Sequence, residues 1–235
     1  MPAREGCLYG VGVGPGDPEL VTLKALRLLR AAPVVAYPAP DRGDSFARTI
    51  VAAWLRPDQH EIAVRFPMQP GPLPAKLYDE AAAVLAAELG RGRDVVFLCQ
   101  GDPLLYGSFI PLLSRLAPRW RTEIVPGISS LTACAAAAAW PLASREESLA
   151  VIPATLDESE LAAQLARAEN AAVIKLGRHF GKLRRVLGNL GLLDGALYVE
   201  RATLPVQRLA RLTAVDPAEV PYFSMALVRR IGPPA

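Results

Sequence analysis

The fold is decided by the stretch Asp94-Val-Val-Phe-Leu-Cys-Gln-Gly-Asp-Pro-Leu-Leu-Tyr-Gly-Ser108. Residues 94–99 form a short apolar run with β-branched members, which is typical of a strand buried on both faces. The run stops at Gly101 and Pro103, because glycine adopts backbone angles closed to other residues and proline disfavours a helical residue before it. A helix is predicted over 109–116. In an open α/β sheet, ligands bind beyond the carboxyl end of such a strand, so this turn is a candidate ligand site.

Strands and helices are expected to alternate along most of the chain. The apolar patterns predict strands at 7–13, 34–37, 61–66, 122–125, 149–152, 171–176, 196–200, 207–212 and 222–228. They predict helices at 20–31, from a cap at Asp44 or Ser45 to about Leu55, and at 75–89, 128–139, 158–169 and 181–190. Alternation of this kind indicates parallel βαβ units, whereas the last three strands lack helices between them and indicate a mixed sheet. We therefore expect an α/β fold with two domains, 1–120 and 121–235.

Composition narrows the class of protein. The chain has 235 residues and is 51% apolar, which is enough for a packed core and excludes a disordered protein. A net charge of +3 is too weak and too dispersed to indicate nucleic-acid binding. All but four of the 26 basic residues are arginine, whose planar fork suits carboxylates and phosphates, although a G+C-rich genome would give the same bias. The arginine content is therefore compatible with an acidic small-molecule substrate.

Cysteine and histidine usage indicates a reducing compartment without a protein-bound metal. The three cysteines are far apart with no C-x-x-C pair, and His60 and His179 are isolated. The longest apolar stretch, near 131–142, falls short of the roughly 18–20 residues that a membrane span needs. The first residues lead directly into a predicted strand and form no signal peptide. We expect a soluble, cytoplasmic protein that binds neither nucleic acid nor membrane.

A glycine-rich turn follows the first predicted strand, as Gly12-Val-Gly-Pro-Gly-Asp17. A dinucleotide-binding fingerprint needs a third glycine three residues after the second, but Pro15 or Asp17 stands there, depending on the register. The Lys-Ser/Thr ending of a phosphate-binding P-loop is also missing. The turn brings backbone close to a ligand, yet a nucleotide-dependent oxidoreductase is only an alternative hypothesis.

Several loops together resemble one family, the S-adenosylmethionine-dependent tetrapyrrole methyltransferases of cobalamin and sirohaem synthesis. The matching stretches are Val11-Gly-Val-Gly-Pro-Gly-Asp-Pro18, Gly101-Asp-Pro103, Val125-Pro-Gly-Ile-Ser-Ser130, Lys175-Leu-Gly177 and Glu200-Arg-Ala-Thr203. They span nearly the whole chain in the family's order and spacing. The resemblance implies two α/β domains, each with a mainly parallel or mixed sheet flanked by helices, with the cofactor in the cleft between them, in a homodimer.

The resemblance also implies functional positions, carried over residue by residue. The implied cofactor-binding residues are Pro15, Gln100, Gly101, Asp102, Leu105, Ser129, Ser130, Leu176, Ala202, Thr203 and Met225. A sulfonium methyl group is already a strong electrophile, so the protein needs positioning rather than a nucleophile of its own. No catalytic base is identified. Asp102, Tyr106 and Glu200 have suitable chemistry, although structural or cofactor-facing roles fit each of them better.

Within the family, the details are most similar to the precorrin-2 C(20)-methyltransferases. The details are Cys99-Gln-Gly-Asp-Pro-Leu-Leu-Tyr-Gly-Ser-Phe109, Tyr37-Pro38 followed by Ser45, Ser129-Ser-Leu-Thr-Ala-Cys134 and Tyr222-Phe-Ser-Met225. Gln100 departs from uroporphyrinogen methyltransferases, which favour a second glycine there. The implied substrate is precorrin-2 or its cobalt-bearing counterpart, a polycarboxylate that Arg42, Arg178 and Arg201 are candidates to bind, although a solvated surface charge is the commoner role for each. The alternatives are methylation at another ring position, or of ribosomal RNA or a protein.

Overall fold

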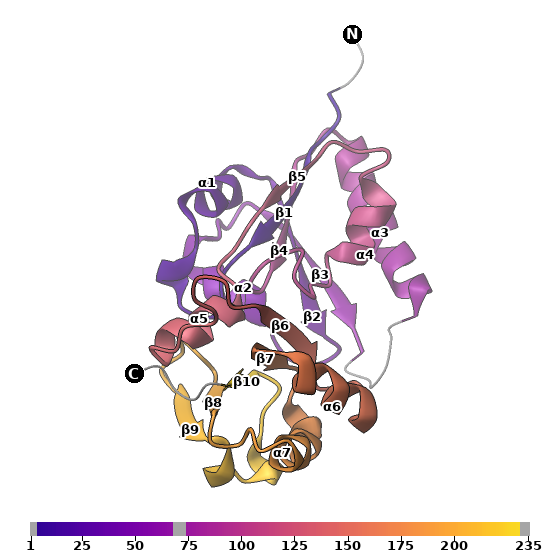
Figure 1. Ribbon diagram of the computed structural model, residues 1–235. Helices are drawn as coiled ribbons and strands as arrows, with labels where there is room; N and C mark the ends of the chain where they lie inside the picture. Colours follow the sequence, from indigo (N-terminus) through magenta and orange to yellow (C-terminus); the bar gives the residue numbers. More distant parts are fainter. Residues whose placement is uncertain (1–3, 68–73, 231–235) are drawn as a thin grey trace. The chain divides into compact units, whose positions relative to one another are not determined.

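The protein is described by a computed structural model that covers residues 4–67 and 74–230 (Figure 1). It divides into two compact units, Met1–Ser129 and Ser130–Ala235. Each unit has its own five-stranded sheet and its own buried core. The α/β fold class expected from the sequence is confirmed.

The first unit is built on a parallel sheet with the strand order β3-β2-β4-β1-β5. Its strands are β1 Leu8–Gly12, β2 Val34–Pro40, β3 His60–Phe66, β4 Val95–Cys99 and β5 Thr122–Val125. Its helices are α1 Leu23–Ala31, α2 Phe46–Val51, α3 Ala75–Gly90 and α4 Ile110–Leu116, with short 3-10 turns at Pro18–Leu20 and Ala52–Trp54. The predicted central strand, β4, is buried along its whole length.

Helices cover both faces of this sheet, as a parallel sheet requires. In Figure 1, α1 lies on one side of the sheet and α3 and α4 lie on the other. Side chains of α1 and α2 share a buried core with Val96 and Leu98 of β4, and those of α3 and α4 share one with Phe97. The connection after β1 leads through α1 toward β2, and the connection after its neighbour β4 leads through α4 past β1 to β5. The chain thus leaves these two adjacent strands in opposite directions, and the carboxyl ends of strands at such a point are where open α/β sheets commonly bind ligands.

The second unit contains a mixed sheet with the strand order β6-β7-β10-β8-β9. Its strands are β6 Leu149–Pro153, β7 Asn170–Ile174, β8 Ala196–Glu200, β9 Arg208–Arg211 and β10 Ser224–Arg229. Its helices are α5 Ser130–Ala137, α6 Glu158–Arg167 and α7 Phe180–Asn189, with 3-10 turns at Gly177–His179, Leu212–Ala214 and Pro217–Glu219. Apolar side chains of α6 and α7 pack with β6, β7 and β8 in one core. The antiparallel pairing of β10 with β7 and β8 confirms the predicted mixed sheet.

Most elements differ from the sequence-based expectation by a few residues at their ends, and two differences have a clear structural cause. Helix α1 begins at Leu23 rather than Leu20, because the Thr22 hydroxyl caps it by accepting a hydrogen bond from the Ala25 N–H at 3.2 Å. The division between the units falls after Ser129, whereas we expected it after residue 120. Strand β5 accounts for the shift, because it pairs with β1 and so belongs to the first sheet.

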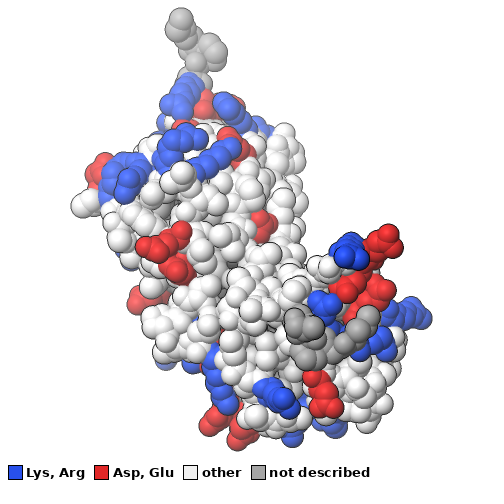
Figure 2. Space-filling view, turned by 60° about the vertical axis from the view of Figure 1, so that its left-hand side comes forward, with Lys and Arg blue, Asp and Glu red and all other residues white. Residues whose placement is uncertain are grey.

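Charged side chains of both signs occur on the face in Figure 2. Several basic side chains gather toward the top of this view, and a broad uncharged surface lies below them. Within residues 4–67 and 74–230, no helix has the length and apolar character that crossing a membrane requires.

Candidate functional site

Three glycine-containing loops meet at the carboxyl edge of the first sheet, after β1, β4 and β5. The Gly101 N–H donates to the Gly14 carbonyl at 2.7 Å, so the loops after β1 and β4 are bridged. A Cβ added at Gly12 would lie 2.5 Å from both the Gly101 oxygen and the Gly127 nitrogen. Gly14 and Gly101 have φ values of 82° and 67°, which side-chain-bearing residues rarely adopt. Glycine is therefore needed at this edge for two reasons: it lets the loops approach one another closely, and it adopts the positive φ values found there.

Asp102 fastens two of these loops together. Its Oδ1 accepts a hydrogen bond from the Leu104 N–H at 2.9 Å within its own loop, and its Oδ2 accepts one from the Gly127 N–H at 3.1 Å in the loop after β5. Both carboxylate oxygens are thus engaged by backbone donors. This geometry favours a positioning role for Asp102 over proton transfer.

An exposed apolar segment follows Asp102. Leu104, Leu105 and Tyr106 have exposed fractions of 49%, 38% and 48%. Tyr106 also has a left-handed backbone, with φ of 54°, which costs a residue with a side chain about 1–2 kcal/mol. Exposed apolar surface held in a strained conformation is typical of a ligand contact.

The remaining predicted positions of the first unit lie around the same edge. Pro15 is buried in the loop after β1, Gln100 is half-buried directly after β4, and Ser129 is half-buried in the loop after β5. The structure therefore brings all the predicted cofactor residues of this unit to the carboxyl ends of three neighbouring strands. Sequence reasoning did not single out Gly12 and Gly127 as site residues, although both stand in the loops it identified.

The second unit gathers four of its five predicted cofactor residues, all but Ser130, at one edge of the mixed sheet. Strands β7 and β8 both run antiparallel to β10, so they are parallel to each other and their carboxyl ends share an edge. The start of β10 lies there too, because Ser224 pairs with Glu200. Leu176, Ala202 and Met225 are buried at this edge, with Thr203 half-buried. Ser130 is exposed and begins α5.

Backbone strain concentrates in the same loops. Six non-glycine residues among those described have positive φ, and four of them lie in loops that carry predicted site residues. One is Tyr106, and the other three are Lys175 at 59°, Arg201 at 47° and Thr203 at 72°. Such strain persists only where surrounding contacts over-determine it, and it clusters at ligand clamps.

A buried carboxylate stands directly before two of the strained residues. Glu200 accepts hydrogen bonds from the Tyr198 hydroxyl at Oε2, 2.9 Å away, and forms an ion pair with the Arg201 guanidinium at Oε1, also 2.9 Å away. Burial, followed by the bond to Glu200, raises the pKa of Tyr198, so this hydroxyl stays protonated and donates. The Arg201 N–H donates to the Phe223 carbonyl at 2.8 Å. Sequence reasoning missed Tyr198, although it stands two positions before Glu200 on a predicted strand, where alternate side chains lie on the same face.

The three candidate substrate arginines lie in different settings. Arg42 is exposed in the loop between β2 and α2, and Arg178 is exposed in the turn after β7, where its Nε lies 3.3 Å from His179 Nε2. Arg201 is held by Glu200 with its side chain 41% exposed. Arg178 and Arg201 follow strands β7 and β8 at the same sheet edge, whereas Arg42 belongs to the first unit.

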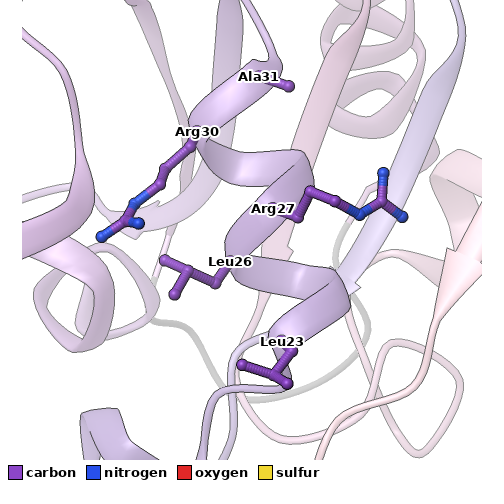
Figure 3. Close-up of a pocket in the computed structure, with 5 residues that line it drawn as sticks. All are labelled: Leu23, Leu26, Arg27, Arg30 and Ala31. Carbon is purple, nitrogen blue, oxygen red and sulfur yellow. The ribbon is translucent and has the colours of Figure 1, made fainter.

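A separate groove lies along α1 and contains none of these residues. Its volume is about 460 Å³, and its lining is Leu23, Leu26, Arg27, Arg30 and Ala31 (Figure 3). Figure 3 shows these side chains projecting from a single helix in different directions. The groove is an open helix surface rather than an enclosed site.

Metal-binding and thiol chemistry find no support in the part of the chain that the structure describes. That part contains no group of three or more histidine, cysteine, aspartate or glutamate side chains able to hold a metal ion. Cys7, Cys99 and Cys134 are buried, and burial raises the pKa of each thiol, to about 12 for Cys134. Thiols of this kind are unreactive.

Comparison with known proteins supports the family that the loop sequences indicated. Residues 7–218 match the family described as tetrapyrrole (corrin/porphyrin) methylases. The chain is 40% identical over 232 residues to a precorrin-2 C(20)-methyltransferase of Sinorhizobium, with 95% of each chain covered. It is 38% identical over 230 residues to a cobalt-precorrin-2 C(20)-methyltransferase of Salmonella typhimurium, covering 96% and 97%. It is 44% identical to the cobalamin biosynthesis protein CobIJ of Mycobacterium tuberculosis, of which it spans 46%, or about half the length.

Solved structures share the architecture. A cobalt precorrin-4 methyltransferase superimposes with a TM-score of 0.76 at 25% identity, covering 95% of this chain and 94% of the other. A Thermus thermophilus uroporphyrin-III C-methyl transferase, complexed with S-adenyl homocysteine, gives 0.69 at 29% identity, covering 96% and 93%.

Proposed function

The chain belongs to the tetrapyrrole methylase family, and from this premise we propose that it transfers a methyl group from S-adenosylmethionine to carbon 20 of a precorrin-2-type ring in cobalamin biosynthesis. The observation that carries the proposal is full-length similarity, near 40% identity, to two relatives that bear this activity in their names. One relative is named for precorrin-2 and the other for cobalt-precorrin-2. We therefore propose a precorrin-2-type ring as the substrate, and experiment must decide whether the ring carries cobalt.

The structure offers a fit for the methyl donor in each unit. In the first, closely packed glycine loops lie at the same sheet edge as the exposed apolar residues Leu104 and Leu105. In the second, buried Leu176 and Met225 stand beside the strained turn that contains Thr203. An apolar surface with a few fixed polar groups suits a thioether joined to a nucleoside. When bound, S-adenosylmethionine supplies an electrophilic methyl group, and the residues of this chain bind and orient it.

The resemblance assigns cofactor contacts to residues at both edges. We propose that Pro15, Gln100, Gly101, Asp102, Leu105 and Ser129 bind from the first unit, and that Ser130, Leu176, Ala202, Thr203 and Met225 bind from the second. Positioning of the methyl donor against the ring carbon is the main catalytic contribution expected of such a site. A closed apolar surround excludes water from the reacting groups.

Of the three candidate bases, Tyr106 has the most accessible side chain. The Asp102 oxygens accept backbone hydrogen bonds, and the Glu200 carboxylate is buried in contact with Tyr198 and Arg201. We therefore favour positioning roles for these two acids. Replacing Tyr106 with Phe tests the third, because a loss of kcat without a change in cofactor affinity would indicate a proton-transfer role.

Labelled methyl transfer tests the function directly. The protein is incubated with S-adenosylmethionine carrying a ¹³C methyl group and with either precorrin-2 or its cobalt complex, and NMR locates the label. Label at carbon 20 supports the proposal and identifies the preferred ring. Label at another carbon, or transfer only to ribosomal RNA or protein, would contradict the subfamily assignment. If calorimetry shows that the protein binds NAD but does not bind S-adenosylmethionine, the methyltransferase hypothesis itself is contradicted.

Arginine–carboxylate pairs are proposed to orient the ring, because each is charge-assisted and geometrically specific. Arg42→Ala and Arg178→Ala should each raise the KM for the ring more than the KM for the methyl donor, with Arg30→Ala on α1 as the control. Arg201→Ala should raise both KM values, because the Arg201 side chain is also paired with Glu200 beside the predicted cofactor turn. Added salt should weaken ring binding in the same direction, since exposed ion pairs are screened. The proposed homodimer is tested by sedimentation velocity, in which a single species of twice the chain mass is expected.

A further inference from the structure

We propose that Glu200 is a positioning residue for the cofactor: its buried carboxylate, held by Tyr198 and Arg201, fixes the 201–203 turn in the backbone conformation that binds the methyl donor. This inference rests on the proposed function, because it assumes that Ala202 and Thr203 contact S-adenosylmethionine. It adds a role for Glu200 and a supporting residue, Tyr198, that no sequence motif indicated.

The carboxylate is built into the second unit rather than displayed on its surface. The Glu200 side chain is only 8% exposed, and each oxygen has its own partner at 2.9 Å, the Tyr198 hydroxyl on one side and the Arg201 guanidinium on the other. Tyr198 is fully buried and packs edge-on against Phe180 with ring centroids 5.6 Å apart. The core therefore fixes Tyr198, and Tyr198 fixes the carboxylate.

The turn that follows Glu200 needs external support. Arg201 and Thr203 both adopt left-handed backbone angles, which are unfavourable for residues with a Cβ. Arg201 is tied to Glu200 through its side chain and to the Phe223 carbonyl through its N–H. Thr203 is tied through its N–H to the Gln207 side chain at 2.8 Å. With the Arg201 side chain anchored at one end, Ala202 lies buried between two strained residues in a defined orientation.

The contacts of Glu200 affect cofactor affinity because they hold the 201–203 turn in one conformation before the cofactor binds. A ligand that binds one backbone conformation loses affinity in proportion to the fraction of time the free protein spends outside it. If the anchor is lost, the left-handed residues relax toward commoner angles before the cofactor arrives. The cost then appears in cofactor binding rather than in the chemical step or in ring binding.

Glu200→Gln is the primary test, because glutamine keeps the size of the side chain but removes the charge that Arg201 pairs with. We expect the Kd for S-adenosylhomocysteine, measured by calorimetry, to rise about tenfold, as for a turn that is correctly formed about one tenth of the time. The KM for S-adenosylmethionine should rise in parallel, while kcat and the KM for the ring change less than about twofold. Amide exchange at residues 201–204 should be faster in the variant before any ligand is added.

Glu147→Gln is the matched control. Glu147 pairs with Arg229 in the same unit at 3.0 Å, and the Arg229 side chain is only 11% exposed. The Glu147→Gln substitution removes a carboxylate–arginine pair of the same kind as Glu200–Arg201, but this pair does not belong to the predicted cofactor turn. We expect lower thermal stability for this variant with an unchanged Kd for S-adenosylhomocysteine.

The outcomes separate the inference from the function on which it rests. If the wild-type protein fails to bind S-adenosylhomocysteine, the proposed function fails. If the wild type binds and Glu200→Gln binds equally well, with only the stability loss seen in Glu147→Gln, the positioning role is overturned. Should Glu200→Gln not fold, Tyr198→Phe decides the question, since it removes one hydrogen bond from the same carboxylate. An increase of about threefold in Kd for that variant supports the role, and an unchanged Kd overturns it.

Discussion

The two units hold the loops at their candidate edges by largely different means, with Tyr106 in the first unit and Gly177 in the second as exceptions. In the first, Gly14 and Gly101 adopt left-handed angles at no steric cost, and Gly12 and Gly127 let three loops approach backbone to backbone. In the second, the left-handed residues carry side chains, and Glu200, Tyr198 and Phe223 hold one of them in place. A loop with glycine at its left-handed positions thus depends on the lack of a Cβ there. A loop with larger residues at those positions depends on hydrogen bonds and ion pairs to particular partners.

Closing the space between the glycine loops should have the largest effect. In Gly12→Ala the new Cβ would meet backbone atoms of Gly101 and Gly127 at 2.5 Å, and backbone cannot move aside cheaply. We expect a loss of about 3 kcal/mol in the free energy of unfolding, the upper end of ordinary overpacking, together with loss of S-adenosylhomocysteine binding. Chemical denaturation and calorimetry measure the two effects.

The control for this substitution is Gly181→Ala in α7, where the added Cβ meets nothing within 4 Å. It should be neutral or stabilise the protein by up to about 1 kcal/mol, because alanine is the better helix former. Equal stability of the Gly12→Ala variant and wild type would show that the first-unit loops are not closely packed.

Changing the backbone preference of a glycine should have a smaller effect. Gly101 has φ of 67°, so Gly101→Ala should cost about 1–2 kcal/mol in folding free energy and reduce cofactor affinity. Its larger counterpart, Gly101→Val, should abolish cofactor binding while the circular dichroism spectrum stays native. Unchanged affinity in both variants would remove this loop from the site.

An ion pair of the first unit, outside the glycine loops, allows a pH test. Arg48 donates from two nitrogens to the Glu61 carboxylate, with Nε–Oε2 2.5 Å and Nη2–Oε1 2.8 Å. The hydrogen bond from Arg48 lowers the pKa of Glu61, burial opposes the shift, and a hydrogen bond from Tyr37 adds to the lowering. Because the pKa is lower in the folded state, the stabilisation is present above the unfolded-state pKa and is lost as the pH falls through the folded-state pKa.

Glu61→Gln should therefore reduce stability by about 1 kcal/mol at neutral pH, a value kept low because both side chains are partly exposed. The difference from wild type should vanish at acidic pH, once Glu61 is protonated in both folded and unfolded states. Thermal melts at several pH values measure it, and a difference independent of pH would contradict the assigned cause. S-adenosylhomocysteine affinity should stay at the wild-type value, in contrast to Glu200→Gln.

The smallest effect is expected where strain is relieved outside the predicted site. Ala139 follows α5 with φ of 48°, and its N–H donates to the Ala136 carbonyl at 3.2 Å. Ala139→Gly should stabilise the protein by about 0.5–1 kcal/mol, because glycine adopts this angle without a Cβ penalty. Denaturation curves measure the gain, and the cofactor Kd serves as the control that should not move. A loss of stability would show that the strain at this position is already offset by unidentified contacts.

The sequence by itself determined the strands, the helices and the family. Buried strands such as β4 were predictable because an apolar run bounded by Gly101 and Pro103 is a local pattern, and β8 was predicted with its observed bounds. The glycine loops were predictable for the same reason, since glycine marks a backbone requirement at its own position. The family assignment followed from these loops taken together and is confirmed.

Only the tertiary structure decided what the acids do. Asp102 reaches Gly127 across 25 positions of sequence, whereas Glu200, at the end of β8, contacts the nearby Tyr198 and Arg201 side chains and is buried by the rest of its unit. The unit boundary was also decided there, because the pairing of β5 with β1 joins segments more than a hundred residues apart. Side-chain chemistry is written in the sequence, but which oxygen faces which donor depends on strand register and loop packing, and those arise only when distant segments come together.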